Sequence, residues 1–136
     1  MAGGGVSGPG GSLVPFEYAV LRAVPRVDRG ECVNVGVVLY CQAQDYLGCA
    51  LHLDADRLRS LDPTADVDAI DSALAALSAV CQGDPAAGAA STGPPRIRFG
   101  WLTAPRSTVV QPGPVHSGMT ADPAAHLQRL LDRLVR

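Results

Sequence analysis

Three short segments near the start of the chain alternate with polar turns and carry the pattern of β-strands. Phe16 to Val24 is rich in β-branched and aromatic residues, and Tyr46 to Leu53 places Leu and Cys side chains on one side. Cys32 to Cys41 is apolar at nearly every position, which indicates a central strand covered on both faces. Because the connections are short, the three segments predict an antiparallel meander.

After the third strand the apolar positions take up a helical period. Asp54 is a suitable N-cap for a short helix. A longer helix is predicted from Asp66 to Cys81, where apolar residues recur at intervals of three and four. Asp122, followed by Pro123 at the first helical position, predicts the start of a last helix. The apolar face of that last helix carries Leu127, Leu130, Leu131 and Leu134.

The remaining segments complete the predicted sheet. We predict Arg96 to Thr103 as a fourth strand, Thr108 to Gln111 as a short fifth strand, and Gln111 to Thr120 as a turn-rich loop. Because the strands do not alternate with helices, the order predicts an α+β fold rather than a doubly wound one. We expect a four- to five-stranded antiparallel sheet, beginning with the N-terminal meander, with the two main helices packed on one face.

The expected domain organisation is simple. Residues 1–14 are rich in Gly and Pro and predict a disordered tail. Residues 15–136 are expected to form a single α+β domain, in which residues 82–95 form a flexible loop of small and polar residues.

Composition narrows the class of protein. A hydrophobic fraction of 47% and a charged fraction of 18% exclude a fully disordered chain. The basic residues are all Arg, and the net charge of −2 disfavours nucleic-acid binding. No apolar run reaches the roughly 18 residues of a membrane helix, and no export signal is visible. We therefore expect a cytoplasmic protein that does not enter a membrane, and its Lys-free, Ala- and Gly-rich composition suggests a GC-rich bacterial genome.

The four cysteines, Cys32, Cys41, Cys49 and Cys81, should be reduced in that compartment. They lack C-x-x-C spacing, so we interpret them as small buried hydrophobic residues rather than zinc ligands. The P-loop, H-E-x-x-H and G-x-S-x-G signatures are absent, and the aspartates lack EF-hand spacing. We therefore assign no catalytic residue, metal or cofactor, and favour a non-catalytic protein.

The turn between the first two strands is the first candidate site. Arg29, with Glu31 and Asn34 as its partners, would form an anion clamp at one end of the sheet. The alternative, which we favour for the charged residues, is a solvated turn whose ion pairs contribute little. Asn34 is a separate case, because an amide within an apolar strand must find hydrogen-bond partners.

The only Trp of the chain, Trp101, is the second candidate, with Arg106 and Ser107 shortly after it. One interpretation is a stacking or partner-docking platform beside an Arg. The other is a core residue at a strand–helix interface, which general burial statistics favour.

The segment FEYAVLRAVPRVDRGECVNVGVVLYC contains the motif R-G-E-x-x-N-V-G-V and resembles the opening of a bacterial family, domain of unknown function 3037. LHLDADRLRSLDPTAD, the segment that ends at Trp101, and APRSTVVQPGPVHSGMTADPAAHLQRLLDRLV also fit, so the resemblance covers Phe16 to Val135. The family carries no established activity, but members encoded near genes for HipA-like kinases imply a protein partner. On the matching segments the binding candidates are Arg22, Arg29, Glu31, Asn34, Arg57, Trp101, Arg106 and Ser107.

Three functional hypotheses follow, in order of preference. The first is an accessory or interaction protein that binds another protein, with a HipA-like kinase as the partner that the family context suggests. The second is a small-ligand or anion-binding module, or an enzyme, that uses a cluster of Arg, Glu and Asn side chains. The third and weakest is nucleic-acid binding through Arg residues. The oligomeric state stays open.

Overall fold

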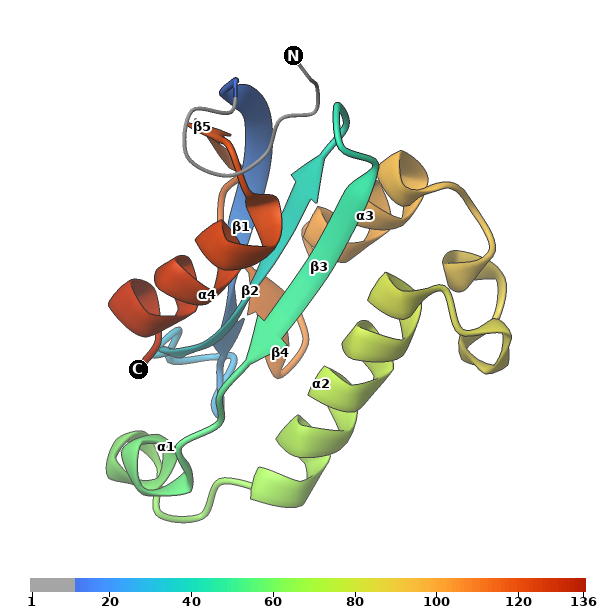
Figure 1. The fold of residues 1–136 in the computed structure, drawn as a ribbon. Coiled ribbons are helices and arrows are strands. Elements are labelled where there is room, and N and C mark those ends of the chain that lie inside the picture. The colour runs from blue at the N-terminus through green and yellow to red at the C-terminus, as the bar shows by residue number, and fades with distance from the viewer. Residues whose placement is uncertain (1–11) are drawn as a thin grey trace.

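An antiparallel sheet of five strands lies at the centre of the fold (Figure 1). The computed structural model describes residues 12–136. Four strands follow the order β3–β2–β1–β4, and β5 pairs with β1 beside β4. The strands are β1 (Val14–Ala23), β2 (Val33–Cys41), β3 (Tyr46–Leu51), β4 (Val110–Pro112) and β5 (His116–Thr120). The predicted α+β class and the antiparallel meander of the first three strands are confirmed.

β1 organises the sheet because it has neighbours along both edges. β2 pairs with nearly the whole of one edge. On the other edge β5 pairs with the first half of β1, and β4 pairs with its last three residues. Between the two, the N–H of Gly113 donates to the carbonyl of Val20 at 2.7 Å. β4 and β5 therefore act as one interrupted edge strand.

The strand β5 contradicts the turn-rich loop predicted from Gln111 to Thr120. Its sequence, His-Ser-Gly-Met-Thr, has little intrinsic preference for a strand. It pairs with the open edge of β1, with Val14 opposite Thr120 and Tyr18 opposite His116. Strand formation here depends on that tertiary partner, which the local sequence does not reveal. The short strand predicted from Thr108 to Gln111 is present, at Val110–Pro112.

Four α-helices and two short 3-10 turns complete the fold. The helices begin where the aspartates predict, because the side chains of Asp54, Asp66 and Asp122 each accept a hydrogen bond from a backbone N–H of the first turn. The elements are α1 (Ala55–Leu61), α2 (Val67–Gln82), η1 (Pro85–Ala87), η2 (Ala89–Ser91), α3 (Pro95–Thr103) and α4 (Pro123–Leu134).

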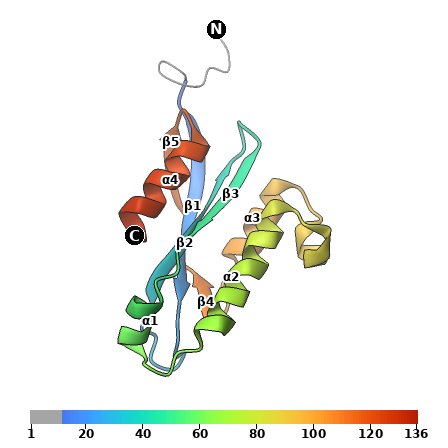
Figure 2. The ribbon, with the colours of Figure 1, turned by 60° about the horizontal axis from the view of Figure 1, so that its bottom comes forward.

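The two long helices lie on opposite faces of the sheet, not on one face as predicted (Figure 2). α2 and α3 cover one face, where Val38 and Tyr40 of β2 are buried. α4 covers the other face, where Val37 and Leu39 are buried. The helical side chains in the first cluster include Ile70, Leu74, Leu77, Phe99 and Leu102, and those in the second include Leu127, Leu130 and Leu131. β2 is apolar at successive positions because each of its faces lies under a helix.

The segment predicted as a fourth strand, Arg96 to Thr103, is the helix α3. Its alternating Ile97, Phe99 and Trp101 resemble a strand pattern, but Pro95 occupies the first turn of a helix, where proline is favoured. Phe99 and Leu102, three residues apart, are the buried pair. Trp101 consequently faces outward with 41% of its surface exposed, so it is not the core residue that burial statistics favoured.

The predicted tail and the predicted flexible loop can be located against the described residues. Most of the predicted tail, residues 1–14, lies outside the described residues, and Val14 already belongs to β1. The stretch expected to be a flexible loop, residues 82–95, contains the two 3-10 turns, with Ser91 buried and bonded to the carbonyls of Asp84 and Gly88. Cys41 and Cys81 are buried as predicted, whereas Cys32 is exposed because it precedes β2.

Candidate functional site

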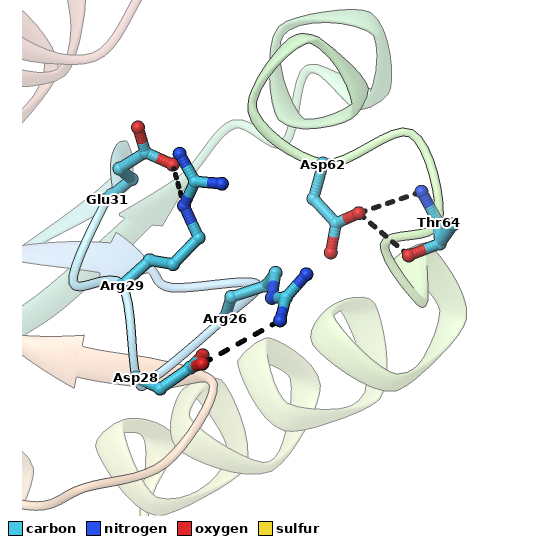
Figure 3. Close-up of polar contacts among 6 residues, drawn as sticks. All are labelled: Arg26, Asp28, Arg29, Glu31, Asp62 and Thr64. Carbon is cyan, nitrogen blue, oxygen red and sulfur yellow. Dashed lines mark hydrogen bonds and ion pairs between the residues drawn. The ribbon is translucent and has the colours of Figure 1, made fainter.

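The charged turn between β1 and β2 places its ion pairs in solvent. Nε of Arg29 lies 3.0 Å from Oε1 of Glu31, and Arg26 lies 3.7 Å from Asp28. All four side chains are about half exposed or more. Figure 3 shows that the turn faces Asp62, in the loop between α1 and α2. Arg29 and Glu31 thus form a direct ion pair in solvent, which is the arrangement that the solvated-turn alternative describes.

Asp62 is the acidic counterpart of this turn. Its Oδ1 accepts hydrogen bonds from the backbone N–H of Thr64 at 3.0 Å and from its hydroxyl at 2.7 Å. These hydrogen bonds lower the pKa of Asp62, and the positive charges of Arg26 and Arg29 lower it further. Each Arg of the turn thus has a carboxylate nearby, which leaves little free positive charge for an anionic ligand.

Asn34 and Arg57 meet at the end of α4 rather than in the turn. Nδ2 of Asn34, on β2, donates to the carbonyl of Leu134 at 3.0 Å. Nη1 of Arg57, on α1, donates to the carbonyl of Val135 at 2.7 Å. Carbonyls at the end of a helix lack intrahelical partners and carry partial negative charge, so an amide and a guanidinium both suit them. In this structure the two predicted site residues anchor the end of α4.

Arg22 lies on β1, directly after a register shift in the pairing of β1 with β2. The shift falls between Leu21, which is opposite Gly36, and Arg22. Arg22 is opposite Asn34 on β2 and opposite Gln111 on β4. Its guanidinium lies against Gly113, where an added Cβ would come within 3.0 Å of Cζ. Arg22 therefore covers the connection between β4 and β5.

Trp101 and Arg106 form a stacked pair at the end of α3. The guanidinium carbon of Arg106 lies 4.5 Å from the centre of the Trp101 ring, within the range of a cation–π contact. Arg106 also donates hydrogen bonds to the carbonyl of Trp101 and, at 3.3 Å, to that of Ala104. Partial burial lowers the pKa of Arg106, but a guanidinium stays charged at neutral pH. Ser107 lies exposed next to this pair.

A hollow of about 310 Å³ opens beside Trp101, between α2, η1 and α3. Its walls are apolar apart from one carboxylate, and they consist of Ala76, Ala79, Val80, Asp84, Ala86, Ala87 and Trp101. Ile97, one helical turn before Trp101, is 49% exposed. We call this surface, Trp101 with Ile97 and the alanine-lined hollow, the Trp101 groove.

The predicted site residues therefore occupy separate places. Arg29 and Glu31 lie in the β1–β2 turn, and Asn34 meets α4 on one face of the sheet. Trp101 and Arg106 belong to α3, which packs on the opposite face. One small ligand cannot contact both Asn34 and Arg106 across a packed sheet. The polar cluster imagined for an enzyme or anion-binding module is not assembled.

Two parts of the Trp101 groove escape sequence reasoning. The sequence pattern predicts a strand at Ile97, and the alanines of α2 and η1 carry no chemical signal of their own. The available signal was the outward side of α2, where Ala75, Ala76 and Ala79 stand in place of the polar residues usual on an exposed helix face.

The described part of the chain contains neither a cluster of metal ligands nor a helix that could span a membrane. Within residues 12–136, no group of three His, Cys, Asp or Glu side chains is placed to hold a metal ion. The helices described here are all too short or too polar to cross a membrane.

The family match found by comparison with known proteins covers the segment that carries the R-G-E-x-x-N-V-G-V motif. No curated protein and no solved structure matches the chain. Residues 18–135 match a family described as "Protein of unknown function (DUF3037)". This match includes the β1–β2 turn, Asn34, Trp101 and all of α4. Because it spans nearly the whole chain, the protein belongs to the DUF3037 family.

Proposed function

We propose that this chain is a non-catalytic interaction protein that binds a partner protein through the Trp101 groove. The observation that carries the proposal is the exposure of Trp101, at 41%, beside an apolar hollow and one turn from the exposed Ile97. Large apolar side chains grouped on a surface mark interaction sites more often than isolated ones do. Trp is also among the residues that dominate binding energy in protein interfaces.

The surroundings of Trp101 favour binding because they hold the ring in place. Arg106 stacks on the ring and is itself fixed by hydrogen bonds to the end of α3. A side chain that is already ordered loses less conformational entropy when a partner covers it. The small alanines of the hollow leave space for an apolar side chain of the partner. The family context suggests a HipA-like kinase as that partner.

The test is a pull-down of the tagged full chain from its own host at native expression, with bound proteins quantified by mass spectrometry. Trp101→Ala is compared with Met119→Ala, a matched control because Met119 is also exposed, at 53%, but lies on β5. We expect one stoichiometric partner, reduced on the order of tenfold or more by Trp101→Ala. The control should retain it.

Two outcomes would refute the proposal. One is a native extract in which no stoichiometric partner accompanies the wild-type chain. The other is a partner that Trp101→Ala, verified as folded by circular dichroism, retains at the wild-type level. In the second case the β1–β2 turn would be the next surface to test, with Arg29→Glu.

A further inference from the structure

The outer edge of β3 has no neighbouring strand among the described residues. Only β2 pairs with β3, which is the last strand in the order β3–β2–β1–β4. Just after β3, the N–H of His52 donates to the carbonyl of Val35 at 2.8 Å, so the backbone groups of His52 point toward β2. Such groups alternate in direction along an antiparallel strand. The N–H and C=O groups of Leu47, Cys49 and Leu51 therefore point away from the sheet.

These three residues leave a row of unpaired backbone groups. No backbone hydrogen bond from another described segment reaches Leu47, Cys49 or Leu51 on this side. Figure 1 shows β3 at the margin of the sheet, beyond β2. An edge strand with unpaired N–H and C=O groups is a template for one more strand.

The two edges of the sheet differ in how they are protected. Proteins guard edge strands with prolines, charged side chains, bulges or interruptions. The β4–β5 edge has Pro112 at the end of β4 and an interruption at residues 113–115. β3 contains no proline and no charged residue, and its pairing with β2 runs without a register shift. An unguarded edge in a sheet whose other edge is guarded indicates a surface that another strand covers.

The apolar core extends to this edge and stays partly exposed there. The partly buried apolar side chains on the α2 side of the strand are Leu47, Cys49, Leu51 and Leu53. A hollow of about 390 Å³ lies between Leu51, Leu53 and α2, where Leu74, Ala75, Asp71 and Ser78 line it. An additional strand on this edge would bring side chains over this hollow and complete the burial of the core.

We propose that β3 pairs with β3 of a second copy of this chain, antiparallel and about a twofold axis at Cys49. In this register the two Cys49 residues are opposite each other, and Leu47 of each copy is opposite Leu51 of the other. The outward groups then form up to about six main-chain hydrogen bonds, two for each opposed pair. The two sheets become one continuous sheet.

The strand is complementary to itself in this register. Leu47 of the second copy lies opposite Leu51 and on the same face, so it brings an apolar side chain to the hollow beside Leu51. On the α4 face, Tyr46 is opposite His52 of the second copy, which is a favourable aromatic pair. These matches favour a second copy of β3 over an unrelated strand.

The charges near β3 allow the two copies to approach. Residues 46–53 contain no Asp, Glu or Arg, so no like charges are opposite each other along the paired segment. Asp45, just before β3, is opposite the uncharged Leu53 of the second copy. The pairing also leaves the Trp101 groove free, because the groove and the hollow at β3 share no lining residue. The dimer therefore does not depend on the proposed function.

The experiment measures the mass and the amide exchange of the full chain. Light scattering after size exclusion, in a reducing buffer that prevents cross-linking through the exposed Cys32, covers about 1 µM to 1 mM, the range of weak association. We expect the mass to rise from one chain to two across this range. Amide exchange followed by NMR should slow on the order of tenfold or more at Leu47, Cys49 and Leu51 as the concentration rises.

A proline at the centre of the pairing tests the edge directly. Cys49→Pro removes an outward N–H but no hydrogen bond to β2, so we expect a folded monomer across the whole range. Cys49→Ala is the matched control, because it loses the same thiol but keeps the N–H, and it should dimerise like the wild type. Trp101→Ala should also dimerise, which separates this proposal from the partner-binding groove.

Three results would overturn the proposal. One is a wild-type chain that keeps the mass of one chain at the highest concentration. Another is a dimer in which the exchange of Leu47, Cys49 and Leu51 does not depend on concentration. The third is a dimer that Cys49→Pro, verified as folded by circular dichroism, forms as readily as Cys49→Ala. If Cys49→Pro does not fold, the exchange pattern of the wild type decides the matter.

Discussion

Gly36 shows why the R-G-E-x-x-N-V-G-V motif ends as it does. A Cβ at this position would come within 2.6 Å of Cδ2 of Leu51 and 2.9 Å of the carbonyl oxygen of Ala50. The first contact is with a side chain that can move, but the second is with the backbone of β3. β2 and β3 can therefore keep their spacing here only if residue 36 has no side chain.

We expect Gly36→Ala to lower the free energy of unfolding by about 1–3 kcal/mol, because the added methyl group overpacks the sheet. Gly100→Ala is the matched control, since the space around Gly100 in α3 is open and alanine favours a helix. That change should stabilise the protein by up to about 1 kcal/mol. Urea denaturation measures both, and equal effects would contradict the explanation.

His126 links stability to pH. Its ring lies 4.5 Å from the ring of Phe16, and burial lowers its pKa, as do the charges of Arg129 and Arg133. The folded state therefore disfavours the protonated ring more than the unfolded state does. Stability should fall as the pH drops below the ordinary histidine pKa of 6.5, until the lower pKa of the folded state is reached.

Thermal melts of the wild type and His126→Gln across this pH range provide the measurement. The variant should lose part of the wild-type decrease in Tm, because it carries no proton at this position. Identical pH profiles would show that the neighbours of His126 do not shift its titration.

At the scale of elements, arginines complete the C-terminal ends of three helices. Arg57 donates to the carbonyl of Val135 just after α4. Arg98 donates to the carbonyl of Cys81 in α2, and Arg106 to the carbonyl of Trp101 in α3. The last carbonyls of a helix are unpaired and partly negative, so a guanidinium satisfies both their hydrogen bonding and their charge. The chain contains no lysine, so arginine makes all three of these contacts.

The anchor of α4 gives a third stability prediction. Asn34→Ala should lower the free energy of unfolding by about 1 kcal/mol, because it removes the hydrogen bond to Leu134. Arg29→Ala should cost less than about 0.5 kcal/mol, because its ion pair with Glu31 is solvated. Urea denaturation compares the two variants. A larger loss for Arg29→Ala would mean that the turn, rather than the α4 anchor, supports the fold.

Local patterns predicted the elements whose stability comes from their own sequence. The aspartate caps and the apolar stripe of α2 belong to this group. α3 was misassigned because Ile97, Phe99 and Trp101 alternate like a strand, although Pro95 indicated a helix. β5 was missed because its partner, β1, lies far away in the sequence.

At the scale of the whole molecule, the sequence named site residues but could not place them together. Asn34 was recognised as an amide that needs a partner, yet its partner is a carbonyl at the far end of the chain. Trp101 was paired with Arg106 correctly, since they are close in sequence and stack in the structure. The packing of α4 on the face opposite α2 could have been inferred from the sequence. β2 is apolar on both faces, so each face needs a covering helix.

The position of β1 also has a consequence for how the chain folds. β1 comes first in the sheet, yet its partner β5 and the covering helix α4 come last. Bringing Val14 opposite Thr120 closes a loop through nearly the whole described chain, and such distant contacts slow folding. Until then one sheet face and the edge of β1 stay open to other chains. Aggregation competes with folding at this stage, both in refolding and during synthesis.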